Sequence, residues 1–375
     1  MPTGCGKCGR PLKANDTTGQ VRRHQVVEIP PVVPEVTEYA LHVSKCPGCG
    51  HTTTADLPEE VPNSCVGVRF QAIASLLTGR CRITRREARE VMAELFGPKA
   101  EVSLGTVGTL EWRTSKALRP VYDEALDAIQ KAKFTNCDET SCRQSNKLAW
   151  LWAAATPKLK VFRIDRRRNC EAFRRLLFGF DGILGSDRFS VFRAHPIRKR
   201  QLCWAHLLRN LRGLEERGGK ARSLGVAGQK LVNAVFKEWY RFRDGQLTRE
   251  RIRRRLAPLR LRLKHLLARH INSPVPAECK IAKDLREYGA ALWTFARVEG
   301  VEPTNNAAER AVRKAVLWRK TSFGSASRWG SRFAERMLTG CESLRAQGRS
   351  ILEFLVESFR ARLVGTDRPT ILPAN

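Results

Sequence analysis

The stretch KFTNCDETSCRQSNKLAWLWAAATPKLKVFRIDR, residues 133–166, decides the fold of this chain. It contains three strand-like runs, KFTNCDET, LAWLWAAAT and KVFRIDR, separated by short polar turns. A helical run, NCEAFRRLLFGF, and a buried-strand candidate, GILGSDRF, follow directly. Three strands in a meander, a crossover helix and a fourth strand predict an α/β core built on a mixed sheet.

Two aspartates lie at positions where such a core places its chemistry. Asp138 is expected at the end of the first strand and Asp187 at the end of the fourth, both among turn-like residues. Carboxylates there project into the crevice outside the strand ends. Glu309, on a helix packed against the sheet, is expected to be the third. Two Asp and one Glu make a hard-oxygen site suited to a pair of Mg²⁺ or Mn²⁺ ions.

Spacing alone leaves these assignments open. Asp138 and Asp187 are also explained as ordinary turn carboxylates. Glu309 follows Asn306 by three residues, so it also fits the last position of a capping box on a helix beginning at Ala307. Other acids compete for the same roles: Glu139, Asp165, Asp181, Glu299 and Glu302.

The charge balance indicates a polyanionic partner. The 375 residues include 68 Lys and Arg against 37 Asp and Glu, a formal net charge of +31. The excess is dense in residues 241–270, which read as helical. DNA is therefore the first partner to expect.

Membrane and export classes find no support in the sequence. The longest strongly apolar run, Leu148 to Ala155, is far shorter than the roughly 20 residues that cross a bilayer. The N-terminus, MPTGCGKCGR, lacks the apolar core of a signal peptide. We expect a cytosolic protein with reduced thiols and no membrane partner.

The first 60 residues carry a paired cysteine motif. CGKCG and CPGCG are separated by two β-like runs, HQVVEIP (24–30) and TEYALHV (37–43). Each knuckle ends in a glycine that lets the backbone turn toward the thiolates. This pattern predicts a zinc ribbon over residues 1–60, with structural Zn²⁺ held by Cys5, Cys8, Cys46 and Cys49. Two unrelated surface pairs, or a redox pair, are the less favoured interpretations.

Residues 61–133 are expected to be helical. Thr84 and Glu87 form a capping-box signature, and Gly97 with Pro98 marks the stop of that helix. A short helix, a turn and a longer helix are compatible with a helix-turn-helix reader of DNA. A plain helical connector explains the pattern equally well.

Several blocks, in their order, resemble the transposases of the insertion-sequence-66 family. They are CDETSCRQSNKLAWLWAAAT, GILGSDRFSVF followed by QLCWAHLLRNL, and EPTNNAAERAVRKAVLWRKTSFGSAS. The paired cysteines and the helical region after them are similar too, so the likeness runs from Cys5 to about Phe354. Longer members carry a further helical region ahead of the cysteines, whereas this chain reaches Cys5 at once.

The resemblance implies a DDE transposase with an RNase H-like core. Asp138, Asp187 and Glu309 match its metal-binding acids, and its reaction is metal-dependent cleavage at transposon ends, then attack of the 3′-OH on target DNA. The implied division has six parts. They are a zinc ribbon (1–60), a helical DNA-binding region (61–133), the first part of the RNase H-like core (134–210), a basic helical insertion (211–300), the final core helices (301–360) and a tail (361–375).

Partners and supporting residues follow from the same resemblance. The expected partners are terminal inverted repeats and target DNA, a second copy of the chain on DNA and accessory proteins of the same element, in the bacterial cytosol or nucleoid. His206 is expected to approach the scissile phosphate or position water, or to be a core histidine. Phosphate contacts are expected from Arg310, Arg313, Arg319 and Lys320, although Arg313 is also spaced to pair with Glu309.

Two other functions compete with transposition. A non-catalytic zinc-ribbon DNA-binding protein derived from a transposase would use the same basic surface with its acids structural or relict. A stand-alone nuclease of the same core fold would cleave without defined DNA ends and without joining products.

Overall fold

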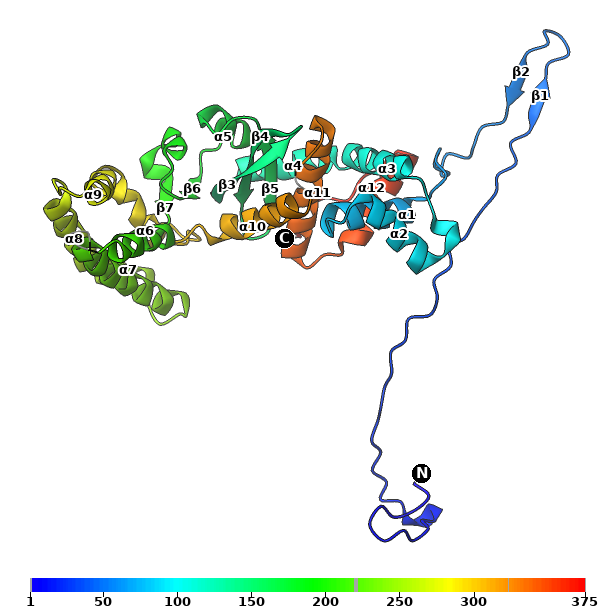
Figure 1. Ribbon diagram of the computed structural model, residues 1–375, viewed down its shortest axis with the longest axis horizontal. Helices are drawn as coiled ribbons and strands as arrows, with labels where there is room; N and C mark the ends of the chain where they lie inside the picture. The colour runs from blue at the N-terminus through cyan, green and yellow to red at the C-terminus, as the bar shows by residue number, and fades with distance from the viewer. Residues whose placement is uncertain (1, 219–221, 323, 375) are drawn as a thin grey trace.

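The centre of the molecule is a five-stranded mixed sheet with strand order β5-β4-β3-β6-β7 (Figure 1). The computed structural model describes residues 2–218, 222–322 and 324–374. β3, β4 and β5 form an antiparallel meander, and β6 and β7 continue the sheet in parallel from β3. The predicted α/β mixed sheet is therefore confirmed. Its strands are β3 (Phe134–Gln144), β4 (Lys147–Ala155), β5 (Lys160–Asp165), β6 (Ile183–Ser186) and β7 (Arg200–Leu202).

A tight turn sets the register of the meander. Ser145 and Asn146 both have positive φ, 50° and 59°, as a two-residue hairpin turn of type I′ requires. Gln144 consequently faces Lys147, and the pairing runs back to Asn136 opposite Ala155.

Alternate residues of β4 face different cores. Trp152 and Ala154 belong to a cluster with α5 (Cys170–Leu176) and the helices that precede β3. Leu151 and Ala153 belong to a second cluster, which includes α10 (Asn306–Ser322) and α11 (Arg328–Gln347). The small alanines of this face and of α10 let that helix approach the sheet closely, which positions Glu309.

Polar side chains of α11 cover the exposed edge of β5. The carboxylate of Glu335 accepts the backbone N–H of Ile164 at 2.6 Å. Thr339 accepts that of Phe162 at 3.1 Å, and Ser343 that of Lys160 at 2.9 Å. Three residues spaced by one helical turn thus satisfy the outward amides of an edge strand, which would otherwise be free to pair with another chain.

The helices of residues 61–133 share a core with the C-terminal helices. The predicted capping box is confirmed, because Thr84 accepts from the Glu87 amide and Glu87 accepts from the Thr84 amide. Gly97, at φ 77°, ends that helix as predicted. The elements are α1 (Val68–Ser75), α2 (Arg85–Phe96), α3 (Leu104–Ala117), α4 (Arg119–Gln130) and α12 (Ile351–Val364). α1, α3 and α4 pack with α11 and α12, and the DNA-reading role of the region stays a prediction.

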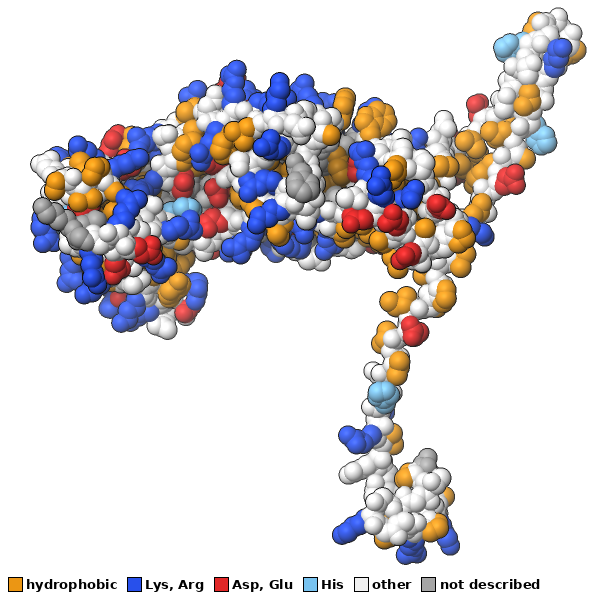
Figure 2. Space-filling view, in the orientation of Figure 1, with side chains coloured by type: hydrophobic (Ala, Val, Ile, Leu, Met, Phe, Trp, Pro, Cys, Tyr) orange, Lys and Arg blue, Asp and Glu red, His pale blue; other side chains and the backbone are white. Residues whose placement is uncertain are grey.

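Residues 204–296 form a helical lobe with its own apolar core, at the end of the molecule opposite α12 (Figure 1). Its elements are α6 (Trp204–Glu216), α7 (Arg222–Arg243), α8 (Arg249–His270), α9 (Pro276–Tyr288) and the 3₁₀ segment η7 (Gly289–Ala296). Lys and Arg side chains gather over this lobe (Figure 2).

The N-terminal residues differ from the predicted ribbon. The only strands there are β1 (Val43–Lys45) and β2 (Thr52–Thr54), among the residues that the structure describes. The predicted strand over 24–30 is wrong, and that over 37–43 survives only at Val43. The two cysteine knuckles lie far apart, joined by an extended segment (Figure 1). β-branched residues favour strands only where a partner or a core surrounds them, and Val26 and Val27 are exposed.

Candidate active site

The pairing of β3 with β6 brings Asp138 and Asp187 to the same level of the sheet. Asn136 faces Gly185 in this parallel pair, and each aspartate lies two residues further along its strand direction. β6 ends at Ser186, directly before Asp187. The prediction that Asp138 ends its strand is wrong, because β3 continues to Gln144. The strand that ends there is β6, at Ser186.

Backbone amides orient both aspartates. One carboxylate oxygen of Asp138 accepts the N–H of Glu139 at 2.9 Å. One oxygen of Asp187 accepts the N–H of Phe189 at 2.9 Å. The turn after β6 therefore determines the direction of the second carboxylate.

Negative charge accumulates around Asp138. Burial, and after it the charges of Glu139, Asp187 and Glu309, raise the pKa of this carboxyl to about 7. The pairing of β3 with β6 places Asp138 and Asp187 on neighbouring strands, and the charge of Glu309 acts on Asp138. Such a group binds a proton tightly, or an added cation.

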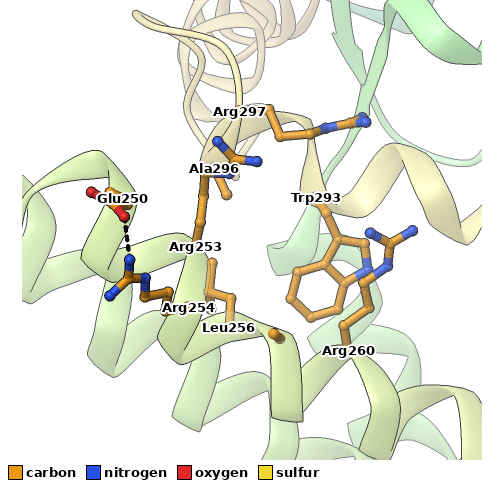
Figure 3. Close-up of a pocket in the computed structure, with 9 residues that line it drawn as sticks. Glu250, Arg253, Arg254, Leu256, Arg260, Trp293, Ala296 and Arg297 are labelled. Carbon is orange, nitrogen blue, oxygen red and sulfur yellow. Dashed lines mark hydrogen bonds and ion pairs between the residues drawn. The ribbon is translucent and has the colours of Figure 1, made fainter.

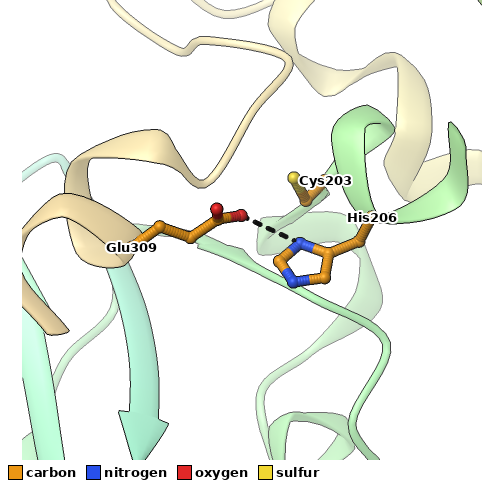
Figure 4. A group of neighbouring side chains, drawn as sticks. All are labelled: Cys203, His206 and Glu309. Carbon is orange, nitrogen blue, oxygen red and sulfur yellow. Dashed lines mark ion pairs between the residues drawn. The ribbon is translucent and has the colours of Figure 1, made fainter. Parts of the chain in front are cut away.

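Glu309 lies in the first turn of α10 and faces another helix. Its carboxylate is 3.2 Å from Nδ1 of His206 and 3.8 Å from Nη2 of Arg209, both on α6 (Figure 4). The helix begins at Asn306 rather than Ala307, and the Glu309 amide bonds to the carbonyl of Asn305. The capping-box interpretation is therefore wrong for Asn306.

One potential metal-ligand atom from each of Cys203, His206 and Glu309 lies within 4.8 Å of the other two. This is the group of three such residues found among the described residues. From the sequence, Cys203 and His206 were too few for a metal site; the fold adds a third donor from 103 residues beyond His206. Asp138 and Asp187 lie outside this close group. Nδ1 of His206 and Oε1 of Glu309 are buried and face each other without hydrogen-bond geometry.

Asn305 is a site residue that sequence reasoning missed. Its side-chain amide donates to the carbonyl of Cys137 at 3.0 Å, and its backbone N–H donates to the sulfur of Cys203 at 3.2 Å. Cys137 precedes Asp138, so Asn305 ties the start of α10 to β3 and α6. The Thr-Asn-Asn run before Glu309 is the sequence signal that could have revealed Asn305.

Four of the five competing acids lie elsewhere in the sequence, whereas Glu139 is adjacent to Asp138 and its charge helps to raise the Asp138 pKa. Glu139 pairs with Arg168 at 2.6 Å, Asp165 pairs with Arg175 at 2.7 Å, and Asp181 pairs with Lys199. The remaining two, Glu299 and Glu302, are exposed.

The basic residues of α10 divide into two groups. Arg319 donates to the carbonyl of Ser141 at 2.6 Å and to its hydroxyl at 2.7 Å, so this side chain anchors the helix to β3. Arg310, Arg313 and Lys320 are exposed. In the described ranges Arg313 makes no ion pair with Glu309, so the alternative explanation of its spacing is wrong.

Each cysteine knuckle is shaped to favour a thiolate. Backbone amides of Lys7 and Cys8 lower the pKa of Cys5, with the Cys8 amide the larger cause. The amides of Cys49 and Gly48 do the same for Cys46. Amides directed at sulfur are the second shell that a thiolate metal site uses.

Comparison with known proteins gives a family match for each of two regions of the chain. The model of the "Transposase IS66 family" matches residues 88–333, well over half of the chain. The model of the "zinc-finger binding domain of transposase IS66" matches residues 2–50. The two matches thus place a zinc-finger segment ahead of a transposase-family region. In the described ranges, every helix is too short or too polar to span a membrane.

One curated relative is the uncharacterized protein y4qI of Sinorhizobium fredii (strain NBRC 101917 / NGR234). It is 24% identical over 274 residues, which is 64% of this chain and 50% of the relative. The chain thus spans about half the length of the curated relative it matches. By the family match across its central region, the chain belongs to the IS66 family of transposases.

Proposed function

We propose that the protein cuts transposon ends and joins them to target DNA, using Asp138, Asp187 and Glu309 to hold two divalent metal ions. The observation that carries the proposal is the level placement of Asp138 and Asp187 on neighbouring parallel strands, with the charge of Glu309 acting on Asp138. The strand order, an antiparallel meander extended by two parallel strands, supports an RNase H-like core.

The residues suit Mg²⁺ or Mn²⁺. Carboxylate oxygens are the ligands these hard cations prefer. A buried carboxyl whose pKa rises to about 7 among other acids is stabilised when cations replace the proton. When bound, such ions activate a water or a 3′-hydroxyl and stabilise the leaving oxygen of a phosphodiester.

The surrounding groups have distinct roles in this proposal. His206 and Arg209 orient the carboxylate of Glu309, and Asn305 fixes the helix that carries it. Arg310, Arg313 and Lys320 are exposed and supply sequence-independent phosphate contacts. Arg319 acts first as a structural anchor of α10.

A cleavage and strand-transfer assay on the element's own terminal DNA tests this function. We expect Asp187→Asn and Glu309→Gln to bind DNA normally and to lose both steps by about 10³-fold, equivalent to roughly 4 kcal/mol. Glu299→Gln, an exposed acid, is the matched control and should retain activity. A fully active Glu309→Gln variant contradicts the assignment of that ligand.

The same assay separates the competing functions. Wild-type protein that binds terminal DNA but never cuts it with Mg²⁺ or Mn²⁺ is a DNA-binding protein derived from a transposase. Cleavage without defined ends and without joined products identifies a stand-alone nuclease.

We also propose that Cys5, Cys8, Cys46 and Cys49 together hold the zinc of the N-terminal domain. The lowered thiol pKa values of Cys5 and Cys46 support this ligand set. It requires the two knuckles to approach each other when zinc binds. Elemental analysis should find zinc in the purified protein and none in Cys46→Ser; zinc retained by that variant contradicts the four-cysteine set.

Joining two ends requires that both be held together, so we propose at least a dimer on DNA, with accessory proteins of the same element as further partners. Light scattering of the active complex measures its mass. A catalytically competent monomeric complex contradicts the dimer, and full activity of the purified protein alone makes accessory proteins unnecessary.

A further inference from the structure

A cavity of about 480 Å³ lies in the helical lobe, away from the carboxylates (Figure 3). Its walls are α8 and η7, which meet around the buried side chains of Leu256 and Trp293. Four arginines line it against a single acid: Arg253, Arg254, Arg260 and Arg297 around Glu250.

Three of these arginines have no counter-charge. Glu250 is occupied by Arg254, one turn further along the same helix. Arg253, Arg260 and Arg297 are exposed, and their side chains make no ion pair or hydrogen bond within the part of the chain that the structure describes. An anion among these three arginines would gain attraction from each of them without competing with a protein carboxylate.

The walls of the cavity are held in place. Arg249 of α8 donates to the carbonyls of Phe295 at 3.0 Å and Val298 at 3.2 Å. Trp293 packs edge-on against Trp204, with ring centroids 5.0 Å apart. The buried indole forms an apolar floor, and a low-dielectric wall strengthens the attraction between the guanidinium groups and an anion.

We propose that this cavity binds a backbone phosphate of DNA and is a second DNA contact of the protein, separate from the carboxylate site. The guanidinium groups of Arg253 and Arg260 on one wall and Arg297 on the other donate to the phosphate oxygens. DNA is the occupant because the cavity opens on the basic surface of a DNA-binding family member. The inference rests on the proposed function only in taking DNA as the substrate.

Two double variants test the proposal. Arg253→Gln/Arg260→Gln removes two cavity arginines without partners. Arg241→Gln/Arg255→Gln removes the same charge from α7 and α8 outside the cavity, and both of these arginines are paired with Glu238. Long-range electrostatics change equally in both, so a difference between them reports local phosphate contact.

The readout is the affinity for a fluorescent DNA duplex as a function of salt. Each lost phosphate contact lowers the magnitude of the slope of log K against log salt concentration by about 0.9, so we expect a decrease of roughly 0.9 for Arg253→Gln/Arg260→Gln, because the two arginines bind the same phosphate. The paired control should change by less than half of that. Equal slopes for the two variants overturn the proposal.

Two further measurements close the alternatives. Calorimetry with ADP and inorganic pyrophosphate tests free phosphate compounds: their binding by wild type, lost in Arg253→Gln/Arg260→Gln while the DNA slope is unchanged, overturns the DNA assignment. If that double variant unfolds, Arg297→Gln on the opposite wall should still lower the slope, by at most about 0.9 because one phosphate is shared, and no change overturns the proposal.

Failure of the proposed chemistry is distinguishable from failure of this site. Asp187→Asn should keep the wild-type salt slope, because it leaves the arginine cavity intact. A protein that never cuts DNA can still show the difference between the two double variants.

Discussion

The carboxylates at the sheet and the arginines of the helical lobe are both groups of like charge, but they differ in burial. Asp138 is largely buried among other acids, and its pKa rises to about 7. Arg253, Arg260 and Arg297 are exposed, so water screens their repulsion. The proposed cation would therefore relieve more repulsion at the first group than the proposed phosphate would at the second.

A third carboxylate provides the reference for this comparison. Glu335 is as buried as any acid in the described chain, yet it is satisfied: it accepts the Ile164 amide at 2.6 Å and pairs with Arg332 at 2.7 Å. Removing one member of a buried pair leaves its partner uncompensated, whereas a buried charge without a partner already destabilises the fold. Removing the Glu335 carboxylate should therefore lower the stability of the fold, and removing the Asp138 charge should raise it.

The largest expected change in stability comes from Glu335→Ala. The substitution strands a backbone amide of the edge strand and the Arg332 guanidinium, so we expect a loss of about 3–5 kcal/mol in the free energy of unfolding. Denaturant unfolding measures it. Glu353→Ala breaks the exposed pair with Arg69 and should cost no more than about 1 kcal/mol. Similar losses for the two variants would break the comparison.

Asp138→Asn should act in the opposite direction. The ordinary pKa of this carboxyl is 3.8 and its folded value is about 7. The folded state therefore holds the proton more tightly, and stability is lost as the pH rises from about 4 through 7. At ~1.4 kcal/mol for each pH unit the loss is at most about 4 kcal/mol.

The variant should lack this pH dependence and be more stable than wild type at pH 8 without divalent ions. Thermal unfolding from pH 4 to 8 in chelator measures the difference. Added Mg²⁺ should stabilise wild type and leave Asp138→Asn unchanged. A variant with the wild-type pH profile shows that the carboxyl titrates normally.

The smallest effect on the core is expected from Cys46→Ser. Residues 2–67 contribute no side chain to the three apolar cores of the described chain. Loss of zinc should therefore expose residues 2–60 to proteolysis and leave the unfolding temperature of the core unchanged. A lowered core temperature would show that the N-terminal domain packs on the remainder.

Local patterns predicted much of the fold. The three strand runs of residues 133–166, the Thr84 capping box and the Gly97 stop depend on neighbours in sequence, and all were confirmed. The run over 24–30 failed because strand preference needs a partner strand, which no neighbouring residue supplies.

The candidate site was predicted only in part, because some of its features depend on contacts between residues that are distant in sequence. Asp138 and Asp187 were recognisable from their blocks, but their level alignment depends on the register of β3 with β6. His206 facing Glu309, the Asn305 bonds and the cover of β5 by α11 join residues roughly a hundred or more positions apart. Spacing along the chain carries no information about such contacts.

By itself the sequence determined the family, the α/β class, the basic charge and the paired cysteine knuckles, because each is written in composition or in short-range spacing. Only the tertiary structure decided that Arg319 anchors α10 and that Glu309 faces His206. It alone also decided that Arg253, Arg260 and Arg297 line one cavity. The physical reason is that the packing of distant helices determines which charged side chains have partners.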